Sequence, residues 1–184
     1  VIDNDRLLKL QPDDFRAYYN RGLALAELDN LSKALADFNQ ALHWASVVNA
    51  PNLAEIYSDR GLVQARLRHW QEAIGDLNQS IRLDPTRYQT FHNRGCVREQ
   101  QGDYQAAVQD FTMALRLNPT YASTYVNRAI AHLKLNQKPL ALKDLRQASA
   151  YFLAEGSHKS YQQVMALMQQ VEPEAPSLQG MANL

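Results

Sequence analysis

The sequence has little of several features that mark common protein classes. Only one of its 184 residues is a cysteine, Cys96, so no disulfide within the chain can hold the fold together. The 19 lysines and arginines balance 19 aspartates and glutamates, which excludes the positive field of a general nucleic-acid or anionic-membrane binder. No apolar run approaches the roughly 18 residues that cross a bilayer, and no signal-peptide pattern is present. We therefore expect a soluble cytoplasmic protein with no nucleic-acid partner and no direct membrane insertion.

The sequence also lacks the motifs of common catalytic and metal sites. It contains no glycine-rich phosphate loop, no nucleophile elbow and no paired zinc-ligand motif. His92, Cys96 and Glu99 share one helical face, but a single helix without a second histidine or cysteine cluster makes a poor metal site. We therefore expect no enzymatic activity, no cofactor and no bound metal.

What the sequence does contain is an internal repeat. Four segments align at a small residue, with spacings of 39, 34 and 34 residues, and an alanine and a large apolar residue follow at fixed offsets. The small residues are Gly22, Gly61, Gly95 and Ala129, the alanines are Ala34, Ala73, Ala107 and Ala141, and the large residues are Phe38, Leu77, Phe111 and Leu145. Such self-similarity predicts a repeat architecture.

Each repeat has the pattern of two helices joined by a tight turn. Apolar residues fall at helical spacing in two runs of about 14 residues. The runs are separated by the pairs Asp29-Asn30, Arg68-His69, Gly102-Asp103 and Asn136-Gln137. A break this short makes the two helices antiparallel, and the small residues mark the place where their backbones approach closely. One hairpin alone leaves an apolar face exposed, so neighbouring hairpins must stack.

This pattern resembles the tetratricopeptide repeat family over roughly residues 13–155. The most faithful unit carries Phe91, Gly95, Ala107, Phe111 and Pro119. Some positions depart from the family pattern: Arg21, Arg60, Arg94 and Arg128 replace a leucine, and the fourth repeat has Ala129, Lys138 and Leu153. The resemblance implies an all-α fold, a right-handed α-solenoid of antiparallel helix hairpins with a C-terminal capping helix.

The repeat pattern also predicts how the chain is divided. We expect repeats at 13–52, 53–86, 87–120 and 121–155, a capping helix within 156–171 that starts near Ser160, and a tail or linker at 172–184. Leu8, Leu10 and Pro12 copy the ending of the second and third repeats. Residues 1–12 are therefore expected to end a truncated preceding repeat, and the natural polypeptide to extend upstream.

The first repeat is five residues longer than the others. Its second helix is expected to continue through Trp44, Val47 and Val48 before a break at residues 49–52. Two interpretations stay open. The extra apolar residues either fold back on the stack or form a projecting patch that docks a partner or a second copy.

An aspartate follows each of the four repeat arginines by sixteen residues. These aspartates are Asp37, Asp76, Asp110 and Asp144. A basic stripe could bind an acidic partner, but one acid for every arginine on the other helix of the hairpin favours structural ion pairs.

By resemblance, the first helix of every repeat lines a concave groove. The candidate partner-binding residues are Arg16, Tyr19, Asn20, Leu23, Asp59, Leu62, Arg66, Gln89, His92, Asn93, Cys96, Asn127, Ile130 and Lys134. An apolar stripe (Leu23, Leu62, Cys96, Ile130) runs beside an amide-rich row (Asn20, Asp59, Asn93, Asn127). Asparagine can donate to and accept from a peptide backbone, although the row could instead cap helix contacts or hold water.

Some family members grip a partner's C-terminal carboxylate with basic residues in this groove. Here the corresponding positions hold Glu55, Asp59, Gln89 and Ser123, and only Arg16 is basic. We therefore exclude this mode of binding.

Together these features predict a non-catalytic protein–protein interaction scaffold that binds a peptide or helix of a partner protein in its groove. Two alternatives stay open: the chain is the recruiting arm of a larger enzyme whose catalytic part lies upstream, or it assembles with itself. Self-assembly would use residues 7–12 or the patch of Trp44, Val47 and Val48.

Overall fold

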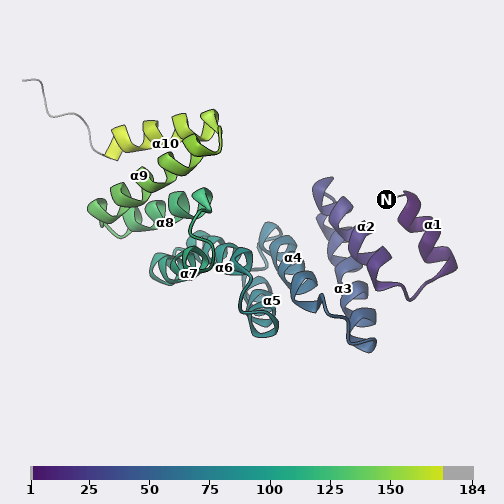
Figure 1. Cartoon of the computed structure of the whole chain (residues 1–184). Coiled ribbons are helices and arrows are strands. Elements are labelled where there is room, and N and C mark those ends of the chain that lie inside the picture. The colour runs from purple at the N-terminus through teal and green to yellow at the C-terminus, as the bar shows by residue number, and fades with distance from the viewer. Residues whose placement is uncertain (1, 172–184) are drawn as a thin grey trace, which may run out of the picture. The chain divides into compact units, whose positions relative to one another are not determined.

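The computed structural model describes residues 2–171, with side chains from residue 4 onward, and these residues form ten helices and no strand (Figure 1). The helices are α1 (Ile2–Leu10), α2 (Phe15–Glu27), α3 (Leu31–Val47), α4 (Leu53–Arg66), α5 (Trp70–Leu83), α6 (Tyr88–Gln100), α7 (Tyr104–Leu117), α8 (Ala122–Lys134), α9 (Lys138–Ala154) and α10 (His158–Val171). The all-α prediction is confirmed for this part of the chain. The predicted tail at 172–184 lies outside the described residues.

The chain divides after Asp103 into two compact units, and each is described by itself. The first unit holds α1 to α6 and the second holds α7 to α10. Within the units, α2 packs on α3, α4 on α5 and α8 on α9 as helix hairpins (Figure 1). No helix within residues 2–171 combines the length and apolar character that crossing a membrane requires.

Left-handed backbone residues close the helix hairpins at the predicted turns. The φ angles are 60° at Asp29, 62° at Arg68 and 59° at Asn136. Aspartate and asparagine tolerate this region, whereas Arg68 adopts it against its own preference because the hairpin must reverse there. The last helix, α10, begins at His158 after Gly156, two residues earlier than the predicted start at Ser160.

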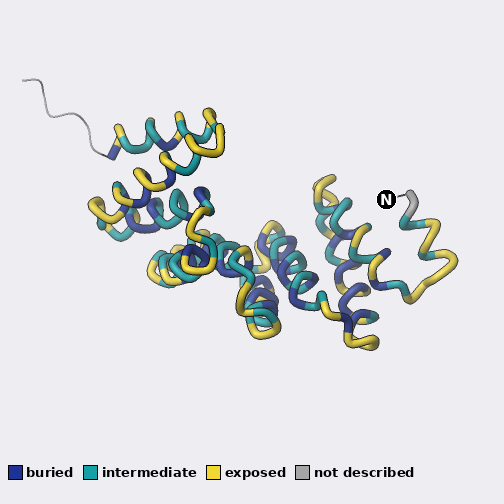
Figure 2. Tube along the Cα trace, in the orientation of Figure 1, coloured by how far each residue is buried: buried dark blue, intermediate teal, exposed yellow. Residues whose placement is uncertain are grey.

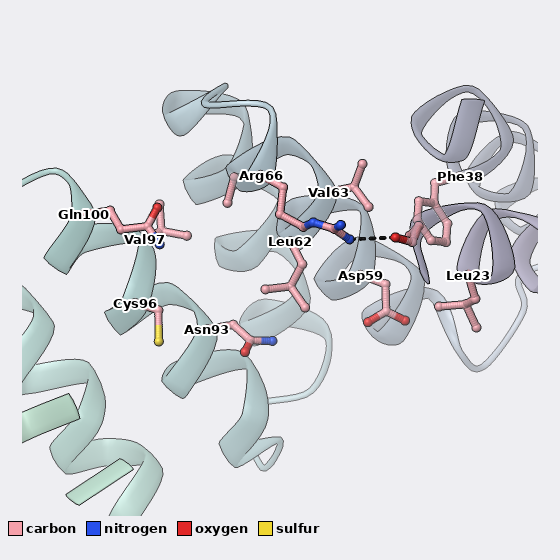
Figure 3. A pocket seen from close by; sticks show the side chains of 12 residues that line it. Leu23, Phe38, Asp59, Leu62, Val63, Arg66, Asn93, Cys96, Val97 and Gln100 are labelled. Atoms are coloured by element: carbon pink, nitrogen blue, oxygen red, sulfur yellow. Dashed lines mark hydrogen bonds between the residues drawn. The ribbon is translucent and has the colours of Figure 1, made fainter. Parts of the chain in front are cut away.

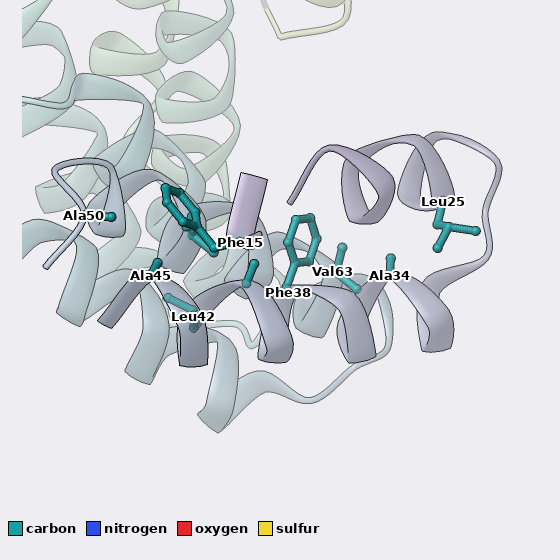
Figure 4. Packing of buried hydrophobic residues seen from close by; sticks show 10 residues of the cluster. Phe15, Leu25, Ala34, Phe38, Leu42, Ala45, Ala50 and Val63 are labelled. Carbon is teal, nitrogen blue, oxygen red and sulfur yellow. The ribbon is translucent and has the colours of Figure 1, made fainter. Parts of the chain in front are cut away.

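Small residues let the two helices of a hairpin approach closely, as predicted. A Cβ atom on Gly22 would lie 3.1 Å from the Phe38 ring, and one on Gly61 would lie 3.1 Å from Leu77 Cγ. The Phe38 and Leu77 side chains are fully buried. Figure 4 shows Phe38 among the buried residues of α2, α3 and α4, and Figure 2 shows the exposed residues gathering at the turns.

The insertion in the first repeat has features of both interpretations: one part packs on the core and the other is exposed. The α3 helix continues to Val47, and the chain then reverses at Asn49, whose φ is 49°. The Ala50 N–H donates to the Ala45 carbonyl at 2.9 Å, and Ala50 is buried. Trp44 packs partly buried against the core, whereas Val47 and Val48 are each 62% exposed. The extension of α3 therefore packs against the core at Trp44, and its last apolar residues, Val47 and Val48, stay exposed.

The repeat arginines connect the two helices of a hairpin, and they also connect the hairpin to the helix that precedes it. Arg21, Arg60 and Arg128 each donate twice to the carboxylate sixteen residues later, with N–O distances of 2.7 to 2.8 Å. Each also stacks on the aromatic ring three residues earlier. The structural interpretation of these three ion pairs is confirmed.

The same arginines reach back to the preceding second helix. Arg60 Nη1 donates to Asn39, Arg94 Nη1 to Asn78 and Arg128 Nη1 to Thr112. Arg21 Nη1 makes the corresponding contact with Asp5 of α1 at 2.6 Å. The α1 helix therefore contacts α2 through the same arginine position that joins the later hairpins to the second helix before them.

Candidate interaction site

A hollow of about 290 Å³ opens between α2, α4 and α6 of the first unit (Figure 3). Its lining residues are Leu23, Ala26, Phe38, Asp59, Leu62, Val63, Ala65, Arg66, Asn93, Cys96, Val97 and Gln100. Six of the predicted partner-binding residues are brought together here: Leu23, Asp59, Leu62, Arg66, Asn93 and Cys96. The helical register that predicted a common face thus places them around one hollow.

The hollow has an apolar centre with polar groups on its walls. Leu62 and Asp59 project from α4 in the same direction, with Leu23 of α2 on one side and Asn93 and Cys96 of α6 on the other (Figure 3). Apolar surface with a few oriented polar groups is the usual lining of a protein's ligand-binding hollow. This lining suits an apolar side chain flanked by polar groups.

A hydrogen bond between Tyr19 and Asp59 fixes one wall. The Tyr19 hydroxyl donates to Asp59 Oδ2 at 2.6 Å and so connects α2 to α4. The Tyr19 ring also packs against Phe38, with ring centroids 6.0 Å apart. Burial, together with the Asp59 carboxylate, raises the pKa of Tyr19 far above its usual value, so its hydroxyl stays protonated and donates. Tyr19 therefore orients Asp59 toward the hollow, a contact that helical spacing within one repeat did not predict.

Arg66 lines the hollow but is already engaged. Its Nη1 donates to the Ala26 carbonyl and its Nη2 to the Asp29 carboxylate, both at 2.8 Å. These contacts satisfy the C-terminal end of α2, where helix carbonyls lack partners. Arg66 therefore serves the packing of two hairpins, and its part in binding stays a prediction.

His92 and Cys96 lie one turn apart on α6. The Cys96 Sγ and His92 Nε2 atoms are 3.6 Å apart, and burial lowers the pKa of the His92 imidazole. Within residues 2–171, no group of three or more histidine, cysteine, aspartate or glutamate side chains is arranged to hold a metal ion. Only Cys96 of the two lines the hollow.

Arg16, Asn20 and Gln89 are exposed and lie outside the lining of the hollow. The Arg16 guanidinium lies 5.1 Å from the ring centroid of its neighbour Phe15. A contact with a partner stays a prediction for these three residues.

The second unit has its own hollow, of about 310 Å³, between α8, α9 and α10. Its lining residues are Ser123, Val126, Asn127, Phe152, Ser160, Gln163, Val164 and Leu167. Of the predicted residues in this unit, Asn127 lies here, whereas Ile130 and Lys134 do not. The sequence predicted α10 only as a capping helix. Ser160 and Gln163 lie at helical spacing beside the apolar residues Val164 and Leu167. This mixed polar and apolar face could have indicated that α10 lines a hollow.

Comparisons with known structures identify the fold. The crystal structure of MamA aligns with a TM-score of 0.73 and 18% identity, covering 84% of this chain and 87% of that protein. PilW, a type IV pilus biogenesis factor, aligns with a TM-score of 0.71 and 21% identity over 97% of this chain and 87% of its own. The Arabidopsis OM64 TPR domain aligns with a TM-score of 0.58 and 20% identity over 65% of this chain and 97% of its own. At these identities the likeness shows the helical solenoid fold alone.

Sequence comparison gives the family. No curated protein sequence matches the chain. Two family models, both described as tetratricopeptide repeat, match residues 13–86 and 88–121, which together make up more than half of the sequence. The chain belongs to the tetratricopeptide repeat family.

Proposed function

We propose that this protein binds a peptide segment or a helix of a partner protein in the hollow between α2, α4 and α6. Tetratricopeptide repeats are in general non-catalytic protein-interaction modules, and membership of the family makes the chain a protein-interaction scaffold. The observation that carries the finer proposal is the convergence of Leu23, Leu62, Asn93 and Cys96 on one hollow. A cytoplasmic location belongs to the same proposal, because a single thiol suits a reducing compartment.

The hollow offers the two kinds of contact that a peptide needs. The Leu23 and Leu62 side chains give an apolar surface for an anchoring side chain, and the Asn93 amide can pair with a backbone N–H or carbonyl. Leu62 is partly buried at the centre, so its replacement by a charged residue would block the hollow directly.

A displayed library of random twelve-residue peptides, selected on the full chain, tests this proposal. We expect selected peptides to bind the wild type and to lose most of their affinity for Leu62→Lys. The matched control is Leu140→Lys, which adds the same charge at an exposed leucine of α9 that is not among the lining residues of this hollow. Circular dichroism checks that both variants keep their helices.

If the selected peptides bind Leu62→Lys as tightly as Leu140→Lys, or if the selection enriches no peptide that depends on Leu62, the proposal is wrong. The working surface would then have to be sought elsewhere, first at Val47 and Val48.

Self-association is a second candidate function, favoured by exposed apolar side chains. Leu10 of α1 is 78% exposed, and Val47 and Val48 project from the end of α3. Light scattering between micromolar and millimolar concentration measures the mass. A mass that rises above one chain in the wild type but not in Leu10→Lys or Val47→Lys supports this candidate, and a constant mass of one chain rejects it.

A further inference from the structure

Among the described residues, Asp59 differs from the buried aspartates Asp37, Asp76 and Asp144 because it has no ion-pair partner. Asp37, Asp76 and Asp144 are each held by a repeat arginine. Within residues 2–171, the Asp59 carboxylate accepts one hydrogen bond, from Tyr19, and forms no ion pair. A carboxylate that is partly removed from water without a positive partner is poorly stabilised in its charged form.

The charged groups around Asp59 do not replace such a partner. Glu55, one turn earlier on α4, adds a second negative charge, and Arg87, which precedes α6, lies 3.8 Å from Glu55. Burial raises the pKa of the Asp59 carboxyl, and Glu55 adds to this effect, while the Tyr19 hydrogen bond and Arg87 oppose it. Arg66, the cation that lines the same hollow, donates to Ala26 and Asp29 instead. Within residues 2–171, the negative charge at this wall is therefore stabilised only in part, by a hydrogen bond and a more distant arginine, and by no ion pair.

Asp59 is also the acid in a row of amides. The corresponding positions of the other repeats hold Asn20, Asn93 and Asn127. An asparagine at this position could accept from Tyr19 through its carbonyl oxygen just as the carboxylate does. The negative charge is therefore not needed for that hydrogen bond, and it stands directly beside the apolar surface of Leu23 and Leu62 (Figure 3).

We propose that the hollow binds a partner segment in which a lysine or arginine neighbours a large apolar side chain, the cation pairing with Asp59 while the apolar group packs on Leu23 and Leu62. This inference rests on the proposed function and specifies the chemistry of the partner. A bound cation supplies the charge that the fold itself does not provide to Asp59. A charge pair of this kind selects among partners as well as adding affinity.

The same peptide library, selected in parallel on the wild type and on Asp59→Asn, tests this inference. Peptides selected on the wild type are expected to carry a lysine or arginine within a few residues of a large apolar residue. Those selected on Asp59→Asn are expected to keep the apolar residue without the basic one. Asp13→Asn, at an exposed position before α2 that is not among the lining residues, is the matched control for loss of one negative charge.

A double-mutant cycle then locates the contact. Replacing the basic residue of a selected peptide by glutamine should weaken binding to the wild type about tenfold, and binding to Asp59→Asn hardly at all. The same replacement should cost the full tenfold on Asp13→Asn. Binding to the wild type should also weaken as salt is raised, because an accessible ion pair is screened.

Three outcomes are distinguishable. The coupling described above supports the inference. Peptides that depend on Leu62 but carry no basic residue, or whose basic residue contributes equally on the wild type and on Asp59→Asn, overturn it and leave the proposed function standing. A selection that enriches no Leu62-dependent peptide overturns the proposed function and this inference together.

Discussion

At the scale of single residues, the protein separates its charges into two kinds. Arg21, Arg60 and Arg128 pair with the aspartates of their own hairpins and also bond to the preceding helix, so these charges are committed to the fold. Asp59 is held by an uncharged donor, the Tyr19 hydroxyl, and it faces a hollow. A paired charge cannot serve a partner without breaking the structure, whereas an unpaired one can. This contrast makes Asp59, and none of Asp37, Asp76 or Asp144, the candidate for recognition.

The stability of the protein should report the state of Asp59. Its pKa is raised in the folded state by burial, so the folded chain binds the proton more tightly than the unfolded chain does. The stabilising effect of the neutral carboxyl is complete below the pKa of an unfolded aspartate, about 3.9. It is lost as the pH rises through the higher folded value. At pH 7 Asp59→Asn should therefore unfold at higher urea concentration than the wild type, and this difference should shrink toward pH 4.

Urea unfolding followed by circular dichroism at several pH values measures this effect. Asp13→Asn controls for the change in net charge. If Asp59→Asn is the less stable protein at pH 7, the charge on the Tyr19 hydrogen bond outweighs the cost of burial, and the interpretation of Asp59 as poorly stabilised is wrong.

At the scale of helices, the hairpins depend on a close approach that only a small residue permits. A Cβ atom on Gly61 would lie 3.1 Å from Leu77 Cγ, 3.2 Å from the Ala73 carbonyl and 3.3 Å from Asp76 Cβ. The fourth repeat has an alanine at this position, and Ala129 is fully buried beside Leu145. The α8–α9 hairpin thus accommodates a methyl group that would make tighter than ordinary contacts in the α4–α5 hairpin, where its neighbours would have to shift.

Two glycine-to-alanine changes in the same hairpin should therefore have opposite effects. Gly61→Ala forces α4 and α5 apart and should lower the free energy of unfolding by about 1–3 kcal/mol. Gly75→Ala lies inside α5 with nothing within 4 Å of the added Cβ, so it should raise that free energy by about 0.5–1 kcal/mol. Urea unfolding of both variants measures the two changes. Equal effects of one sign would show that helix propensity, and not the approach of the two backbones, governs this hairpin.

The helices were predictable from sequence because their determinants are local. Apolar spacing, turn residues and the small-residue positions all act within one hairpin, and the pairing of Arg60 with Asp76 followed from a fixed offset in the chain. The contact of Tyr19 with Asp59 and the wall that α10 gives to the second hollow depend on how neighbouring hairpins stack. Side-chain positions across a stack are not encoded in the spacing within one repeat, so these features required the structure.

At the scale of the whole chain, two of the buried clusters within the described residues are built from separate sets of helices. One contains Phe38 and Ile56 with their neighbours on α2, α3 and α4. The other contains Leu145 and Val164 with their neighbours on α8, α9 and α10. In repeat proteins stability is approximately a sum of the repeats and of their nearest-neighbour contacts. Damage to one cluster should therefore open its own helices first.

Hydrogen–deuterium exchange of the full chain, followed by mass spectrometry, measures this locality. Phe38 and Leu145 are fully buried, and truncation to alanine should cost about 3–5 kcal/mol for Phe38→Ala and about 2–5 kcal/mol for Leu145→Ala. We expect Phe38→Ala to speed exchange in α2 and α3 far more than in α8 and α9. Leu145→Ala should show the reverse, because each change removes contacts from one cluster only.

The two variants test this prediction together, since the helices that one variant should affect are the control region for the other. If both variants speed exchange equally in all four helices, the chain unfolds as a single cooperative body. Faster exchange confined to the helices of the damaged cluster would instead mean that the helices around the first hollow can open while α8 and α9 stay folded. Binding of a partner at Asp59 and Leu62 should then protect α2, α4 and α6 in the same experiment and leave exchange in α8 and α9 unchanged.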